Sequence, residues 1–226
     1  MVYFAEPFND HQFDFGNVQS FTGIYHETPF PVLILDEGQA PDLPDNHLLL
    51  VGYGKNGATG FLQQAAQTKG TLAGKHIRLA GTLIYGDGRA LLELTDEEKA
   101  VLEVLPAPTS SSPAPAPIAI GAPKNVQLAG EILDPKCWFG VMKPAEGKVH
   151  KSCAIRCISG GIPPVFRVKA DGENIYYVLR GEAGEPINEE VLAFVGEPVS
   201  LSGQASEAHG WRVLKVAPST INYITK

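Results

Sequence analysis

Three cysteines and one histidine lie close together in the sequence, between positions 137 and 157, and their side chains are the ones best suited to chemistry. Fifteen residues separate Cys137 from Cys153, three separate Cys153 from Cys157, and His150 precedes Cys153 by three positions. Three thiolates and an imidazole form a ligand set for tetrahedral zinc, and soft thiolates also suit copper(I) or an iron–sulfur centre. Met142 would add a thioether ligand for copper. The spacing is not a standard zinc-finger or ferredoxin pattern.

Two other states of these cysteines are open alternatives. Cys137 could form a disulfide bond, structural or redox-active, with either Cys153 or Cys157, and closing that loop would stabilise the fold by about 3 kcal/mol while leaving one thiol free. A bond between Cys153 and Cys157 fits less well, because a regular helix places these residues near the outer limit of disulfide geometry. The third alternative is that all three cysteines are simply packed in the core.

A short helix would position three of the four side chains. Residues 148–158 contain neither proline nor glycine, and Gly160 and Gly161 follow them as a left-handed cap. In such a helix the histidine and the last two cysteines stand at positions i, i+3 and i+7 and share one face. Cys137 then needs only to fold back from the preceding loop to complete a cluster of four ligands.

The cysteine segment is basic, whereas the rest of the chain is acidic. Residues 131–170 carry seven Lys and Arg against three Asp and Glu, a net charge of +4. The whole chain has a net charge of -7, so the other residues together carry -11. Positive neighbours lower the pKa of a thiol and so favour both metal binding and redox exchange. The same bases, with the amides of Gly160 and Gly161, predict a partner at this loop, either an unidentified protein or a small anionic ligand.

A stretch rich in proline, alanine and serine divides the chain into two halves. Residues 106–117 carry no charge and almost no large apolar side chain, which is typical of an extended linker. We therefore expect a first domain over residues 1–105 without cysteine, a linker over 106–124, and a second domain over 125–226 that carries the Cys/His loop 134–164.

The two halves share an order of expected elements: three strands, a helix and two further strands. The helix-like stretches are Ala58 to Gln67 in the first half and Ile187 to Val195 in the second, with Asn188 as the cap. Strands that contain glycine where a barrel strand must bend support the same comparison. Both halves are therefore predicted to be small five-stranded barrels that resemble the OB-fold, so the protein is expected to be mainly β.

Matching glycines in the two halves locate an insertion. The numbering offset between equivalent glycines is 107 for Gly23 and Gly130, but it rises to 129 for Gly52 and Gly181 and is 122 for Gly81 and Gly203. The second half therefore gains an insertion between its first and third strands, where every cysteine lies. Loops of this region commonly contact ligands in OB-folds.

Several function classes are disfavoured by the sequence. No apolar run approaches the roughly 20 residues of a membrane-spanning helix, and the first half, with 6 bases and 14 acids, lacks the basic face of a nucleic-acid binder. The glycine-rich segment 52–57 lacks the P-loop pattern, and no serine stands in a nucleophile elbow. We expect a non-enzymatic binding module with a metal or redox centre in the second barrel; a thiol-disulfide protein or sensor and a structural adaptor with a stapled loop are the alternatives.

The cysteine segment also resembles a signature of uncharacterised bacterial proteins. The residues concerned run Gly130-Glu-Ile-Leu-Asp-Pro-Lys-Cys137 and Gly147-Lys-Val-His-Lys-Ser-Cys-Ala-Ile-Arg-Cys-Ile-Ser-Gly-Gly-Ile-Pro-Pro164. Such proteins are similar to membrane-anchored or envelope proteins with an ectodomain. The resemblance implies a periplasmic or envelope location, with a targeting segment and any membrane anchor outside this chain. Met1-Val-Tyr-Phe-Ala-Glu-Pro7 has no signal-peptide pattern. If no targeting segment precedes it, the protein is expected to be cytoplasmic.

Overall fold

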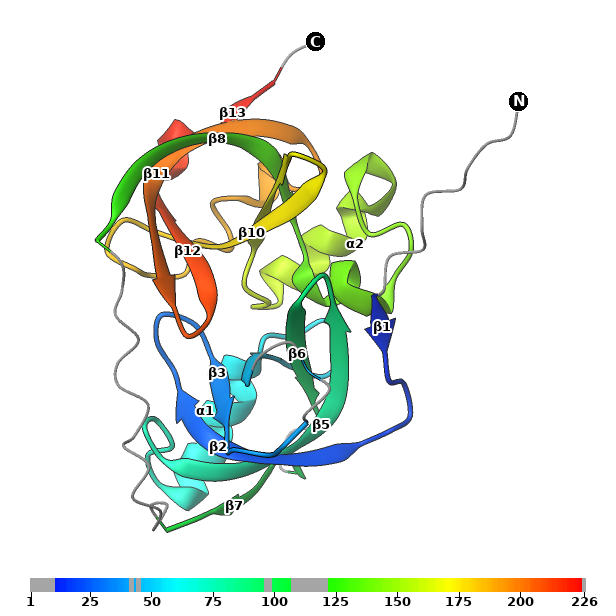
Figure 1. Cartoon of the computed structure of the whole chain (residues 1–226), viewed down its shortest axis with the longest axis vertical. Helices are drawn as coiled ribbons and strands as arrows, with labels where there is room; N and C mark the ends of the chain where they lie inside the picture. Colours follow the sequence, from blue (N-terminus) through cyan, green and yellow to red (C-terminus); the bar gives the residue numbers. More distant parts are fainter. Residues whose placement is uncertain (1–10, 41–42, 44–45, 96–98, 107–121, 225–226) are drawn as a thin grey trace.

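Two closed five-stranded β-barrels make up most of the protein. A computed structural model describes residues 11–40, 43, 46–95, 99–106 and 122–224. Figure 1 shows the two barrels stacked one above the other, with helix α2 at one side of their junction. The expected fold class, mainly β with two small barrels, is confirmed.

The first barrel has the strand order of an OB-fold. Its strands are β2 (Gln19–His26), β3 (Val32–Leu35), β4 (His47–Val51), β5 (His76–Gly86) and β6 (Arg89–Leu94). Neighbouring strands in the sheet follow the order β5-β2-β3-β4-β6. The third and fifth strands in chain order, β4 and β6, are parallel, and β6 also pairs with β5, which closes the barrel. The short strands β1 (Gln12–Phe13) and β7 (Val101–Val104) add to β5.

The second barrel repeats this order. Its strands are β8 (Lys124–Leu133), β9 (Val165–Ala170), β10 (Glu173–Arg180), β11 (Pro198–Ala208) and β12 (Trp211–Val216). Again the third and fifth strands, β10 and β12, are parallel, and β11 with β12 closes the barrel. A final short strand, β13 (Asn222–Tyr223), pairs with β11 after a single turn, η4 (Pro218–Thr220). β8 already begins at Lys124, and most of the expected linker, residues 107–121, lies outside the described residues.

The bending glycines predicted from the sequence occupy equivalent places in the two barrels. A Cβ atom on Gly23 or Gly130, in the first strand of each barrel, would lie 2.0 or 2.1 Å from a carbonyl oxygen of the neighbouring strand. Gly81 and Gly203, in the fourth strands, show the same close approach, at 2.4 and 2.2 Å. Only a residue without a side chain lets the strands curve this tightly.

The two expected helices of the barrels have different outcomes. Helix α1 (Ala58–Lys69) lies where it was predicted and buries Ala58, Leu62 and Ala65 against the first barrel. The prediction for Ile187 to Val195 was wrong, because that stretch forms turns and one 3-10 turn, η3 (Leu192–Phe194). Asn188 does not cap a helix of its own; its amide donates to the Ile158 and Ile162 carbonyls, at 2.7 and 2.9 Å, where α2 ends.

The insertion lies where the glycine offsets placed it. The first and second strands are joined by the long segment 134–164 in the second barrel, but only by the short segment 27–31 in the first. The insertion contains a wide helical turn, η2 (Cys137–Val141), and helix α2 (Gly147–Ser159). The helix predicted over 148–158 is thus confirmed, and Gly161 has the left-handed backbone expected of its cap, with φ of +100°.

Three hydrophobic clusters form the core. One fills the first barrel and one fills the second, whereas the third contains residues of both. From the first barrel it includes Phe30, Val32, Leu49, Val51, Ile84 and Leu91. From the second it includes Trp138 and Phe139 of the insertion and Trp211 of β12. The insertion therefore packs into the contact between the barrels, and this position brings its cysteines close to the first half of the chain.

Candidate metal centre

The cysteine cluster begins where β8 leaves the second barrel. Asp134 follows the strand directly, and its Oδ1 atom accepts a hydrogen bond of 2.9 Å from the backbone of Lys136. The Trp138 amide donates to the Asp134 carbonyl at 3.0 Å, which starts η2 and turns Cys137 inward. Cys137 is buried as a result.

Helix α2 supplies the other predicted ligands. Its buried residues His150, Ala154, Cys157 and Ile158 repeat at the spacing of one helix face, which turns toward the interior. Cys153 lies at the edge of this face and is half-buried. The helix thus presents an imidazole and two thiols toward Cys137.

The ligand atoms of these side chains form two groups that share Cys137. In the first group Cys137, His150 and Cys153 have ligand atoms within 4.8 Å of one another, and in the second the same holds for Asp134, Cys137 and Cys157. All three cysteines are free thiols. The four residues predicted from the sequence are therefore brought together as a cluster that could hold a metal ion, and Asp134 joins them.

Two atoms of this cluster that are able to bind a metal ion are buried without a hydrogen-bond partner among the described residues. They are His150 Nε2 and Asp134 Oδ2, on residues that are 4% and 0% exposed. A buried polar atom that lacks a partner costs free energy, and a role as a metal ligand is one physical reason for it. Packing of the three thiols alone leaves these two atoms without a partner, whereas a bound metal ion would give them one.

The electrostatics of the cluster depend on its burial. The neighbouring Cys157 thiol, burial and the Asp134 carboxylate raise the pKa of Cys137 far above its usual range. Burial also lowers the pKa of His150, so its imidazole is favoured in the neutral form that binds metals. Without a metal ion, Cys137 is therefore favoured as a neutral thiol and His150 as a neutral imidazole.

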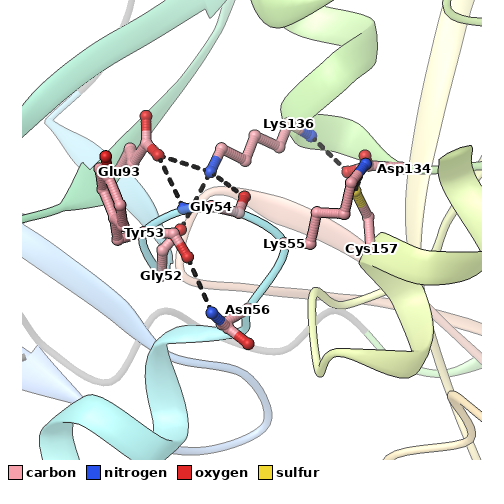
Figure 2. A network of polar contacts seen from close by, with 9 residues as sticks. All are labelled: Gly52, Tyr53, Gly54, Lys55, Asn56, Glu93, Asp134, Lys136 and Cys157. Atoms are coloured by element: carbon pink, nitrogen blue, oxygen red, sulfur yellow. Dashed lines mark hydrogen bonds and ion pairs between the residues drawn. The ribbon is translucent and has the colours of Figure 1, made fainter. Parts of the chain in front are cut away.

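Lys55, from the first half of the chain, closes the cluster. Its Nζ atom lies 2.9 Å from Cys153 Sγ and 3.8 Å from Cys157 Sγ. The hydrogen bond to Cys153 raises the pKa of Lys55, so the ammonium form is favoured. Figure 2 shows Lys55 reaching Cys157 from the loop that joins β4 to α1. Lys55 was not predicted from the sequence, because 98 positions separate it from Cys153.

Lys136 fastens the insertion to the same loop. Its side chain is buried, and its Nζ atom donates to the Gly52 carbonyl at 3.0 Å, to the Gly54 carbonyl at 2.6 Å and to Glu93 Oε1 at 2.6 Å. Figure 2 shows these contacts between Lys136 and the loop. Carbonyl groups of the glycine-rich segment 52–57 thus enclose this lysine.

The far end of the loop meets the end of α2. The Gly57 amide donates to the Gly160 carbonyl at 2.8 Å. A Cβ on Gly57 would lie 2.1 Å from the Gly161 carbonyl oxygen, and a Cβ on Gly160 would lie 1.9 Å from that of Lys55. The glycines therefore permit the close contact that brings Lys55 to the thiols.

Other residues singled out in the sequence have simpler roles. Met142 is 43% exposed at the end of η2. Among the bases of the segment, Lys151 lies 3.0 Å from Glu197, and Arg167 lies 3.3 Å from Glu131. Part of the positive charge counted in the sequence is thus neutralised by neighbouring carboxylates.

In the described part of the chain, no helix is both long and apolar enough to cross a membrane.

The chain was also compared with known proteins. Searches with protein-family models, against curated proteins and against solved structures give no match to this chain.

Proposed function

We propose that this chain is a non-enzymatic metal-binding module that holds a thiophilic transition-metal ion where its two barrels meet. The ligands are Cys137, His150, Cys153 and Cys157. We favour zinc, because three thiolates with one imidazole are a ligand set of structural zinc sites. The resemblance of the cysteine segment to envelope proteins supports an extracytoplasmic setting.

Buried His150 carries this proposal: one of its ring nitrogens lies within 4.8 Å of the Cys137 and Cys153 sulfurs, and its Nε2 atom has no hydrogen-bond partner among the described residues. Zinc–sulfur and zinc–nitrogen bonds of about 2.3 and 2.0 Å place the ligand atoms of three thiolates and one imidazole about 3.5 to 3.8 Å apart in a tetrahedral site. The ligand atoms of Cys137, His150 and Cys153 lie within 4.8 Å of one another, so inward movements of about 1 Å would bring these three to that geometry. Metal binding would release the thiol protons and replace the charge-poor cluster by bound thiolates.

Elemental analysis and thiol counting on one sample of the purified chain test the proposal. We expect stoichiometric zinc, and thiols that react with a thiol reagent only after a chelator is added. Cys153→Ser and His150→Ala should lower the metal content, whereas Ser152→Ala, on the exposed face of the same helix, should leave it unchanged. A metal-free protein with three reactive thiols, even after incubation with zinc, would contradict the proposal.

Thiol-disulfide exchange is the second candidate function. The half-buried Cys153 thiol, whose sulfur lies 2.9 Å from Lys55 Nζ, would lose its proton, attack a disulfide of a partner protein and release one partner thiolate. Cys137 or Cys157 would then attack the mixed disulfide, so the chain forms one disulfide as the partner gains two thiols. This candidate predicts one free thiol per chain and no metal after exposure to such a disulfide. Three thiols that persist there would exclude it.

A further inference from the structure

The cluster contains more ligand atoms than a single four-coordinate ion uses. Cys137 belongs to both groups of ligand atoms: one group is completed by His150 and Cys153, the other by Asp134 and Cys157. A tetrahedral ion bound by the three cysteines and the histidine leaves the carboxylate out. Asp134 is therefore a donor for which a single ion of this kind has no use.

Each group has its own buried donor without a hydrogen-bond partner among the described residues. In the first group this is His150 Nε2, and in the second it is Asp134 Oδ2. The other carboxylate oxygen, Oδ1, is already held by the Lys136 backbone at 2.9 Å. The side chain is therefore fixed in place, with one carboxylate oxygen within 4.8 Å of the Cys137 and Cys157 sulfurs.

The charge of the cluster also exceeds what one divalent ion neutralises. Three thiolates and one carboxylate carry four negative charges in a largely buried site. One divalent ion leaves two of them, and the Lys55 ammonium faces Cys153 and Cys157 as one further positive charge. The Lys136 ammonium is engaged by Glu93 and two carbonyls. With Lys55 counted, one divalent ion leaves a net charge of -1 in the site and two ions leave +1, so the charge of the ligands suits a second ion as well as it suits one.

We propose that the site takes two divalent transition-metal ions that share the Cys137 thiolate. His150 and Cys153 complete the protein ligands of one ion, and Asp134 and Cys157 complete those of the other. Ions in two-metal sites lie about 3.5–4 Å apart, a separation that one bridging sulfur can span. This inference rests on the proposed function and extends it: it raises the number of ions to two, assigns Cys157 to the second ion and gives Asp134 a role.

Titration of the metal-free full chain with Zn²⁺ alone, followed by calorimetry and elemental analysis, tests the inference. We expect two ions per chain. Asp134→Asn keeps an oxygen for the Lys136 amide but removes the charge, and it should bind one ion, as should Cys157→Ser. Glu146→Gln, a carboxylate of the same insertion outside both groups, is the matched control and should still bind two.

Loading the unmodified chain with Co²⁺ gives a readout that needs no variant. Two ions bridged by one thiolate should couple magnetically. The paramagnetic signal per cobalt ion should therefore be lower with two equivalents of cobalt per chain than with one. A stoichiometry of one ion, unchanged in Asp134→Asn, would overturn the two-ion site while leaving the single-ion function intact. Failure to bind any metal would overturn both proposals.

Discussion

Lys136 shows how one side chain joins the insertion to the first barrel. Its ammonium group is buried, with three oxygen acceptors from the 52–57 loop and Glu93. A buried ion pair adds little by itself, but removal of one partner leaves an uncompensated charge. The contribution of Lys136 therefore depends on Glu93 remaining charged beside it.

Replacement of Lys136 by methionine should lower the free energy of unfolding by about 3–5 kcal/mol, because Glu93 stays buried without its cation. The double variant Lys136→Met/Glu93→Gln should recover part of this loss. Urea unfolding of the three proteins measures both effects. Lys169→Met, on an exposed position of β9, is the control and should change stability by less than about 0.5 kcal/mol. Equal losses in the Lys136 and Lys169 variants would show that the buried contacts contribute nothing.

At this scale the sequence predicted the ligands that are close in sequence and missed those that depend on tertiary structure. His150, Cys153 and Cys157 follow from helix periodicity alone. Lys55 reaches Cys153 only because the first barrel packs against the insertion. Asp134 lies three positions before Cys137, but its role depends on the turn that η2 makes, and no local pattern specified that turn.

The elements around the site are positioned by backbone contacts that tolerate no side chain. Gly57 is the residue before helix α1, and its amide bonds to Gly160 at the end of α2. The 52–57 loop, which carries Lys55, is thereby held between two helices from different halves of the chain. The precision of the lysine–thiol contact depends on this glycine contact.

Gly57→Ala should separate the loop from α2. The new Cβ would lie 2.1 Å from the Gly161 carbonyl oxygen, although the backbone of Gly57, with φ of -74°, suits alanine. We expect a loss of about 1–3 kcal/mol, typical of overpacking, together with weaker metal binding. Thermal unfolding and zinc titration measure the two effects.

Gly60→Ala, three residues further along in α1, is the matched control, because a Cβ there meets no other part of the protein within 4 Å. It should stabilise the protein by up to about 1 kcal/mol, because alanine favours a helix interior more than glycine does. If the two variants behaved alike, the contact between Gly57 and Gly161 would not hold the loop.

The barrel elements were more predictable than the connections. Gly23, Gly81, Gly130 and Gly203 were identified from repeated spacing, and the structure shows each against a neighbouring strand. The stretch from Ile187 to Val195 also looked helical, but Asn188 is used to bond the carbonyls at the end of α2. Tertiary contacts there prevailed over local helix propensity.

At the scale of the molecule, the two halves share a core that the sequence did not reveal. The linker composition predicted two domains but gave no prediction about whether they pack together, and one hydrophobic cluster contains residues of both barrels. The outer face that one barrel packs against the other depends on how its strands close into a barrel. The alternation of apolar and polar residues along a strand does not identify that face. A polar chain crosses the same contact: Trp138 Nε1 donates to the Tyr176 hydroxyl at 2.8 Å, and that hydroxyl donates to Asp87.

Asp87 is the point where the first barrel receives these hydrogen bonds. It occupies an Asp-Gly turn between β5 and β6, with φ of +46°. His11 Nε2 lies 3.2 Å from its carboxylate, and the Asn174 amide donates at 2.9 Å. The hydrogen bonds from His11, Tyr176 and Asn174 lower the pKa of Asp87, against the opposite effect of burial.

Asp87→Asn should therefore weaken the contact between the barrels in a pH-dependent way. Asparagine accepts the same turn, so the change removes mainly the charge, with an expected loss of about 1.5–3 kcal/mol at pH 7. Because folding lowers the pKa of Asp87, its stabilisation is present above the unfolded pKa of about 3.9 and is lost as the pH falls from there toward the lower folded pKa. Urea unfolding at pH 7 and pH 3.5 should show a smaller difference between wild type and variant at the lower pH.

Asp171→Asn, in the exposed Asp-Gly turn between β9 and β10, is the control for this prediction and should differ from wild type by less than about 0.5 kcal/mol at both pH values. A pH-independent loss in Asp87→Asn would mean that the charge of Asp87 does not hold the barrels together.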